Sequence, residues 1–421
     1  MIDMTGSVLS SLQESTRPAD QKMVEALESR LADDERVVSR LSSSGKLTHE
    51  RDGETSERGG GDGGVLFVAT DRKLVFVLDT PTGRETADIP YTDLKDATVD
   101  SGFFSTTVSV RVWGRGQFSL SPSKADDVSE IIAYITTASE LWQRVVAALQ
   151  DARQHISVLG SAIEDGRTAK AEATRQSARE CIEKARERAS DAPVPLRDAI
   201  ASRIETVATE LQRTRTESHF QRGETLTEQT TPVTETGEYD ATYADWKRAR
   251  EQFEMALRIA AEEGFDGAGD AQAEIAAIDE RLSTLETQPL ARAERARERA
   301  QRADDTAEAI GHWESALERY RNALEAGWGT DADFDGETDA LRMQIEWVVT
   351  RLLALRQERA RELESTGDDI AWSDSESARK PYEQARDHLD GARRLAAVYR
   401  AGDPSALALA RDRLDDKIQS V

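Results

Sequence analysis

The sequence predicts an α+β domain, a small curled sheet closed by a helix, followed by an all-α region of helical hairpins. Before about residue 140, β-branched and aromatic residues alternate with polar ones, a pattern typical of short strands. After it, Ala, Arg, Glu and Leu dominate at helical spacing, and an aromatic–alanine pattern recurs. We therefore expect an α+β domain over residues 1–140, a helical connector with a first hairpin over 141–230, and a repeat region over 240–421.

In the first domain, apolar residues recurring every fourth position predict an opening helix over residues 19–34. A hydrophilic stretch over residues 48–64 has no apolar periodicity and ends in a glycine cluster. A closing helix should follow the sheet, capped by Ser123 or Asp126, with an apolar stripe that begins at Val128. The remaining apolar or alternating runs predict about seven strands, at residues 36–41, 65–70, 73–78, 86–89, 96–99, 106–113 and 117–120.

Three short motifs of the first domain resemble a known family. Residues 65–77 read VLFVATDRKLVFV, preceded by DERVV at 34–38 and followed by IPYTDL at 89–94. This order is similar to that of bacterial and archaeal PH-like domains, in which such a hairpin precedes further strands and a C-terminal helix. The resemblance covers about residues 20–140. It implies a PH-like barrel of about seven strands plus a C-terminal helix, acting as a binding or assembly module without catalysis.

The second part contains an internal repeat at intervals of about 67 to 71 residues. Aromatic and alanine residues spaced by 3, 4 and 3 form one face of a helix on which another helix can approach closely. The pattern resembles the second helix of a tetratricopeptide repeat, although the interval departs from that family's 34 residues. We expect helical hairpins related to that family in style. The copies contain Trp246, Ala249 and Phe253; Trp313, Ala316 and Tyr320; Tyr382 and Ala385; and, most weakly, Ala178, Ile182 and Ala185.

The charge of the chain is strongly acidic. It has 80 Asp and Glu against 55 Lys and Arg, a net charge of -25 in 421 residues, and arginine supplies most of the positive charge. Such a surface repels nucleic acid, so no nucleic-acid partner is expected. Many carboxylates with few lysines resemble the proteins of salt-loving archaea, where salt screens the self-repulsion. The alternative is an ordinary acidic protein with a solvated surface.

Catalytic and metal-binding patterns are missing from the sequence. The five histidines are widely separated, and no HExxH or CxxC motif occurs. Cys181 is expected to be a small buried residue, and the glycines at 59–64 lack the Lys-Ser/Thr of a phosphate loop. The acidic residues at 330–337 loosely resemble a calcium loop, but Arg342 occupies the position of its last ligand. We expect no metal, no cofactor and no enzymatic activity.

The candidate ligand-binding residues are four cations in or near hairpins of the first domain: Lys46, Arg72, Lys73 and Arg84. They could gather at one rim and bind an anionic headgroup or acidic peptide; the alternative is that they are solvated turn residues. The charge run at 292–302 predicts a solvated helix face with i,i+4 ion pairs.

The leading functional hypothesis is a non-enzymatic adaptor that binds protein partners through the PH-like module and the helical repeats. Peripheral binding to an anionic membrane through the PH-like domain is the alternative, and an enzyme hidden among the carboxylates is a third. A self-assembling homo-oligomer is a variant of the first. The chain lacks both an apolar run long enough to span a membrane and a signal-peptide pattern at its start, so a cytoplasmic location is expected.

Overall fold

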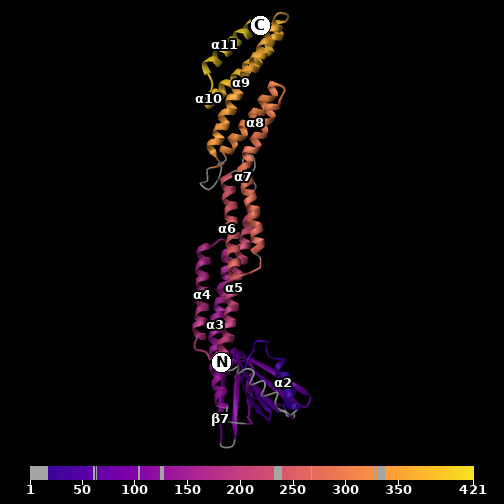
Figure 1. The fold of residues 1–421 in the computed structure, drawn as a ribbon, viewed down its shortest axis with the longest axis vertical. Helices are drawn as coiled ribbons and strands as arrows, with labels where there is room; N and C mark the ends of the chain where they lie inside the picture. The colour runs from indigo at the N-terminus through magenta and orange to yellow at the C-terminus, as the bar shows by residue number, and fades with distance from the viewer. Residues whose placement is uncertain are drawn as a thin grey trace. The chain divides into compact units, whose positions relative to one another are not determined.

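The structure is a computed structural model, and it divides into two compact units, Met1–Ser218 and His219–Val421, each described by itself below (Figure 1). The division falls within helix α5 (Val194–Gln229). The structure describes residues 18–59, 62, 64–102, 105–123, 128–231, 239–266, 268–325, 328–329 and 337–421.

The first unit contains two antiparallel sheets in its described part. One has the strand order β1-β4-β5-β6 and the other the order β3-β2-β9-β8-β7. The nine described strands exceed the seven predicted. Their bounds are β1 Val37–Ser43, β2 Leu47–Arg51, β3 Glu54–Arg58, β4 Val65–Thr70, β5 Lys73–Thr80, β6 Gly83–Pro90, β7 Leu94–Ser101, β8 Thr106–Val112 and β9 Gly116–Leu120.

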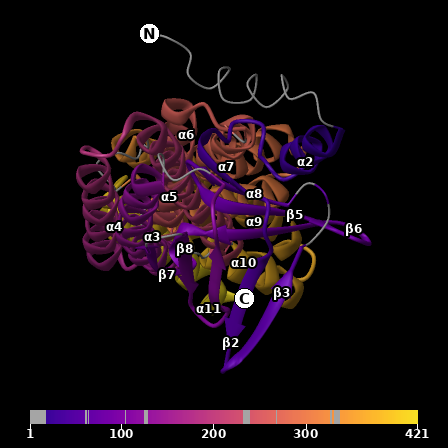
Figure 2. The same ribbon diagram turned by 90° about the horizontal axis from the view of Figure 1, so that it is seen from below.

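Strands β4 and β5 are buried on both faces, which explains their continuous apolar sequence. Alternate side chains point to opposite faces of a strand. Phe67 and Phe76 therefore meet in the core between the sheets, with ring centroids 4.8 Å apart. The other face, which includes Val68 and Val75, is covered by helix α2 (Pro18–Glu28), shorter than the predicted 19–34 (Figure 2).

Strands β2 and β3 lie largely within the hydrophilic stretch over residues 48–64, where no strand was predicted. All five side chains of β3 are exposed, and Leu47 is the fully buried residue of β2, so no apolar alternation marks the pair. Asp52 and Gly53 join them with φ of 53° and 82°, the two-residue turn that Asp-Gly favours in hairpins. The 3-10 helix η1 (Tyr91–Asp93) lies between β6 and β7, which are both longer than predicted.

The closing helix is confirmed and is much longer than the sheet requires. Helix α3 runs over Val128–Glu164 and continues into a three-helix bundle with α4 (Thr168–Ala189) and α5. Its apolar stripe packs into the sheet core, and Trp142 donates its indole N–H to the carbonyl of Asp71, 3.0 Å away. Asp126, one of the two predicted caps, lies outside the described residues, as does most of the acidic stretch at 330–337.

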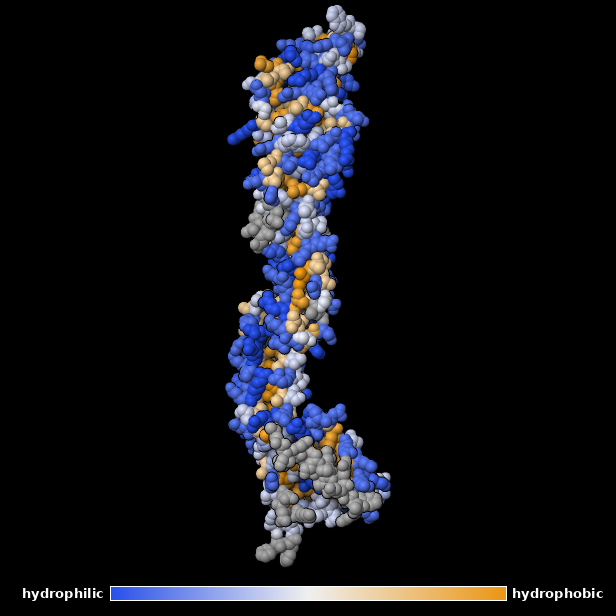
Figure 3. Space-filling model, viewed as in Figure 1, coloured by the Kyte–Doolittle hydropathy of each residue, from blue (hydrophilic) through white to orange (hydrophobic). Residues whose placement is uncertain are grey.

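The second unit is a succession of helices that pack mainly on their neighbours in sequence. Its described helices after α5 are α6 Tyr239–Glu263, α7 Ala268–Arg302, α8 Thr306–Glu325, α9 Thr338–Ala371, α10 Ser375–Tyr399 and α11 Pro404–Ser420. Figure 3 shows hydrophilic side chains over most of the visible face of these helices, with narrow apolar stripes between them. None of the described helices combines the length and the apolar stretch needed to cross a bilayer.

The repeat residues are buried on the helices that carry them, as their spacing predicts. Phe253 packs on Gly223 of α5, and Tyr382 packs on Gly367 of α9, because only a residue without Cβ leaves room for the ring. The likeness to tetratricopeptide repeats stays a prediction. The buried residues are Trp246, Ala249 and Phe253 on α6, Trp313, Ala316 and Tyr320 on α8, and Tyr382 and Ala385 on α10.

Candidate functional site

The four predicted cations are all paired with carboxylates. Lys46 lies 3.1 Å from Glu57, and Arg84 lies 3.6 Å from Asp79. Arg72 binds Asp34, and this hydrogen bond lowers the pKa of the carboxyl group. Lys73 contacts Asp88 at 3.1 Å and Glu35 at 3.4 Å.

The same cations lie at two ends of the first sheet. Arg72 and Lys73 are at the start of β5, whereas Arg84 is opposite Asp79 near the end of that strand. Six residue steps of a strand separate the two ends by about 20 Å. Lys46 lies at the same end as Arg84. A Cβ added at Gly59 would lie 3.9 Å from Cα of Lys46 and 3.7 Å from the carbonyl oxygen of Asp79. The structure therefore does not bring the four cations together.

The turn between β8 and β9 presents a different surface. Trp113 is 62% exposed, and the Lys95 ammonium lies 5.0 Å from the centre of its ring, within cation–π range. The backbone N–H of Trp113 donates to the carbonyl of Asp93 at 2.9 Å. The exposed ring is thus in contact with a cation, and the backbone of the same residue is fixed to η1.

Arg115 completes this surface and fixes the turn to strand β2. Its guanidinium donates to the carbonyl of Asp88 at 3.3 Å, and its own carbonyl lies 2.6 Å from Nε2 of His49. Gly116 follows with φ of 87°, and a Cβ there would lie 2.1 Å from the carbonyl oxygen of Glu50. Glycine is required at this close approach. We call Lys95, Trp113 and Arg115 the β8–β9 turn surface.

Asp71 is a buried carboxyl group in the turn between β4 and β5. Burial raises its pKa to about 6, although its Oδ1 accepts a hydrogen bond from the backbone N–H of Arg36 at 3.2 Å. Thr70, beside it, accepts hydrogen bonds at its carbonyl from the hydroxyls of Tyr91 at 2.7 Å and Tyr134 at 3.1 Å. These contacts tie the turn to η1 through Tyr91 and to helix α3 through Tyr134.

The single cysteine of the chain lies on a helix of the first unit. Cys181 is half-buried on α4, and desolvation raises the pKa of its thiol, which disfavours the reactive thiolate. Within the described ranges, no group of three or more His, Cys, Asp or Glu side chains is arranged to hold a metal ion.

The β8–β9 turn surface was not predicted, although the sequence contains a pattern that indicates it. The run Trp113-Gly-Arg-Gly116 places an aromatic residue before two glycines and a cationic residue between them, where a tight turn exposes both side chains. The contribution of Lys95 was hidden, because it lies on a neighbouring strand and only the pairing of β7 with β8 brings it close.

Comparison with known proteins supports the fold of the first domain. Residues 31–137 match the family model described as the bacterial PH domain. That range begins after α2, spans both sheets and ends in the first part of α3. Neither a search of curated proteins nor one of solved structures found a match. The N-terminal sheet region is therefore PH-like, and an all-helical region follows it.

Proposed function

We propose that this chain is a non-enzymatic binding protein whose PH-like domain holds a protein partner through the β8–β9 turn surface. The observation that carries the proposal is the exposed ring of Trp113, which lies in cation–π contact with Lys95 on a turn fixed by backbone hydrogen bonds. The match of this domain to a family of binding modules supports it. We place the protein in the cytoplasm.

The chemistry of this surface favours a partner with apolar and acidic groups. Tryptophan and arginine are enriched among residues that dominate binding energy, because they combine large apolar area with a polar group. A rigid turn has little conformational entropy to lose when a partner binds. Lys95 and Arg115 also supply local positive charge on a chain of net charge -25.

The helical region fits the role of a scaffold. Helices that pack on their sequence neighbours form quasi-one-dimensional arrays, which present long surfaces to partners. The repeat residues themselves are buried, so their role is to pack the helices. We propose that the array is related in style to tetratricopeptide repeats and that its exposed faces bind a second partner.

Affinity purification with full-length wild type, Trp113→Ala and Trp372→Ala tests the proposal. Trp372 is 94% exposed at the end of α9 and is a matched control for the loss of a surface ring. We expect wild type and Trp372→Ala to retain the partner of the PH-like domain, and Trp113→Ala to bind that same partner at least about tenfold more weakly, because truncating a hot-spot residue costs about 2 kcal/mol or more. Equal retention by all three proteins would reject the role of the turn. Light scattering on the same samples separates a foreign partner from a second copy of the chain.

Peripheral membrane binding is the second candidate, and the same surface favours it. Tryptophan partitions into the membrane interface, and neighbouring Lys and Arg side chains are attracted to anionic lipid. The net charge of -25 opposes this attraction over the rest of the molecule. Flotation with neutral and anionic vesicles distinguishes the two: recovery with anionic vesicles alone, abolished by Trp113→Ala, would favour the membrane.

We also propose that the acidity reflects an environment of concentrated salt. Screening shortens the range of repulsion between carboxylates, so added KCl should stabilise the folded chain. A thermal midpoint that rises by several degrees between about 0.1 M and 1 M salt is the expected result. A midpoint that is unchanged or falls would favour an ordinary acidic protein.

A further inference from the structure

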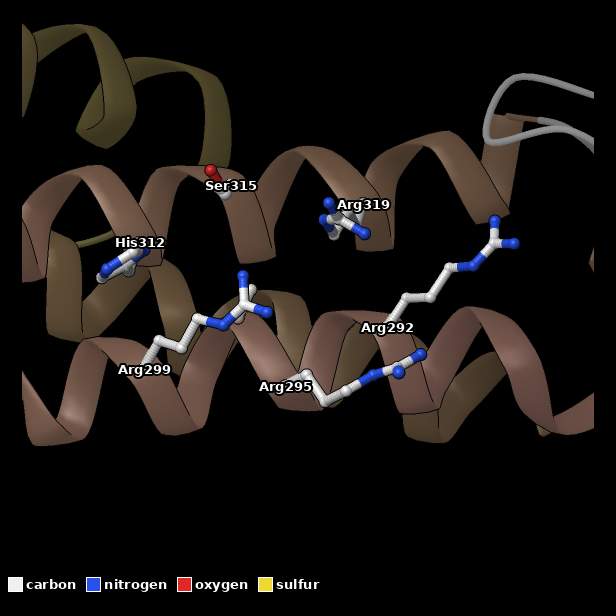
Figure 4. A pocket seen from close by; sticks show the side chains of 7 residues that line it. Arg292, Arg295, Arg299, His312, Ser315 and Arg319 are labelled. Atoms are coloured by element: carbon white, nitrogen blue, oxygen red, sulfur yellow. The ribbon is translucent and has the colours of Figure 1, made fainter.

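Helices α7 and α8 form an open pocket of about 290 Å³, and four of its six polar lining residues are arginines (Figure 4). Arg292, Arg295 and Arg299 line it from α7, at the i, i+3 and i+7 positions of one helix face. In Figure 4, Arg292 and Arg299 extend from α7 into the space beside α8. Helix α8 contributes the other polar lining residues, His312, Ser315 and Arg319.

The acidic residues of the same charge run point elsewhere. Glu294 lies 3.8 Å from Arg297, and Glu298 lies 3.3 Å from Arg302. Neither of these ion pairs lines the pocket. The prediction of a solvated face with ion pairs therefore holds for one side of the helix only.

The three α7 arginines of the pocket form no ion pair with any carboxylate in the described part of the chain. Arg295 donates through Nε to the carbonyl of Ala291 at 3.2 Å. On the α8 side of the pocket, Glu308 lies 3.6 Å from Nε2 of His312. In a chain where acidic residues outnumber basic ones by 80 to 55, this separation of charge is a specific feature of the α7–α8 pair.

Holding these cations side by side is unfavourable in the absence of an anion. Like charges three or four residues apart on a helix repel each other and destabilise it, and Arg292, Arg295 and Arg299 are spaced in this way. A bound polyanion would replace this repulsion between the arginines by attraction to the ligand. Guanidinium groups match phosphate oxygens with two parallel hydrogen bonds, and a serine hydroxyl and an imidazole add further donors.

We propose that this pocket binds a free solute that carries two or more phosphate groups. The volume is at the lower end of the range for small-molecule sites and exceeds what a single phosphate group needs. Ala296 is the one apolar residue among the described lining residues, so the pocket offers little to an apolar ligand. This inference concerns the second unit and is independent of the function proposed for the PH-like domain.

Calorimetric titration of the full chain with tripolyphosphate, at fixed ionic strength, tests the inference. We expect saturable binding to one site, weakened at least about tenfold in Arg295→Ala/Arg299→Ala, since this variant loses charge-assisted hydrogen bonds to the phosphate groups. The matched control is Arg258→Ala/Arg302→Ala, which removes the same charge from exposed positions of α6 and α7 outside the pocket. It should bind within about twofold of wild type. Equal weakening in both variants, or no saturable heat with wild type, would overturn the site.

The variant Arg295→Lys/Arg299→Lys keeps the charge and the helix and so guards against a loss of folding. Ammonium groups cannot form the paired hydrogen bonds, and we expect affinity to fall several-fold in this variant. Undiminished affinity would overturn the arginine-based recognition. Displacement of tripolyphosphate by vesicles that contain phosphatidic acid would overturn the assignment to a free solute and indicate a lipid headgroup instead.

Discussion

The PH-like domain and the helical second unit are stabilised in different ways. In the PH-like domain, side chains distant in sequence form hydrogen bonds to one turn: Tyr91, Tyr134 and Trp142 all donate to the backbone of Thr70 or Asp71. In the second unit, each helix contacts mainly its sequence neighbours, and aromatic rings pack against glycines of the adjacent helix. Long-range contacts make the first region cooperative, whereas an array of neighbours responds locally to a defect.

Trp142→Ala should have the largest effect and tests the cooperativity of the PH-like domain. It removes a buried ring and the hydrogen bond to Asp71, so we expect a loss of about 3–5 kcal/mol in the free energy of unfolding. Hydrogen exchange read by mass spectrometry should show faster exchange across all strands of both sheets. Trp313→Ala removes a similar ring from α8 and should accelerate exchange only in the second unit. A defect of Trp142→Ala confined to α3 would contradict this picture.

Asp71→Asn should stabilise the PH-like domain at neutral pH by about 2–3 kcal/mol. The folded pKa of about 6 exceeds the ordinary value of 3.8, so the folded state binds the proton more tightly. Wild-type stability is therefore fullest below pH 4, falls as the pH rises to about 6, and is constant above. Asparagine still accepts the hydrogen bond from the backbone N–H of Arg36, but it does not titrate, so the dependence of stability on pH is lost. Denaturant titrations at pH 4 and pH 7 give the free energy of unfolding at each pH. Asp52→Asn, at an exposed position, is the control. A difference between the two pH values that is as large in Asp71→Asn as in wild type would contradict the assignment.

Gly367→Ala and Gly311→Ala should change stability in opposite directions. A Cβ at Gly367 would lie 2.5 Å from Cε1 of Tyr382, whose hydroxyl is held by Asp368 at 2.7 Å. Overpacking outweighs the gain in helix propensity, and we expect a net loss of about 1 kcal/mol. Gly311 in α8 has no atom within 4 Å of the added group and should gain about 0.5–1 kcal/mol. Thermal melts compare them, and equal signs would show that ring packing on glycine is unimportant.

Tyr320→Phe should give the smallest effect, a gain of about 0.5–1 kcal/mol. The Tyr320 hydroxyl is buried and has no hydrogen-bond partner in the described structure, and the matching position of α6 is Phe253. Tyr382→Phe removes a hydroxyl that donates to Asp368 and should cost about 1 kcal/mol. Chemical denaturation measures both; a destabilised Tyr320→Phe would reveal a polar partner for that hydroxyl.

Much of the fold was predictable from the sequence, since apolar spacing reports burial directly. The hairpin of β4 and β5, the closing helix that forms the first part of α3, and the buried aromatic–alanine faces all followed from it. Strands β2 and β3 did not, because β3 is an edge strand without buried side chains. The Asp52-Gly53 turn was the available signal for this hairpin.

The candidate sites were less predictable, because they depend on register between elements. The arginines of α7 read as one charge run, and only their alignment with His312 and Arg319 on α8 separates pocket from solvated face. Likewise, Lys95 reaches Trp113 through the pairing of β7 with β8. The four cations selected from the sequence were instead neutralised by carboxylates from other strands and loops, such as Asp34.

The position of α2 has a practical consequence for dividing the protein. The match to the bacterial PH domain begins at residue 31, after this helix has ended. A fragment cut to that boundary would leave the outer face of β4 and β5 open to water. The residues laid bare would be Leu66, Val68, Val75 and Val77. Such a contiguous apolar strip promotes aggregation, so a soluble PH-like fragment has to begin at or before Pro18.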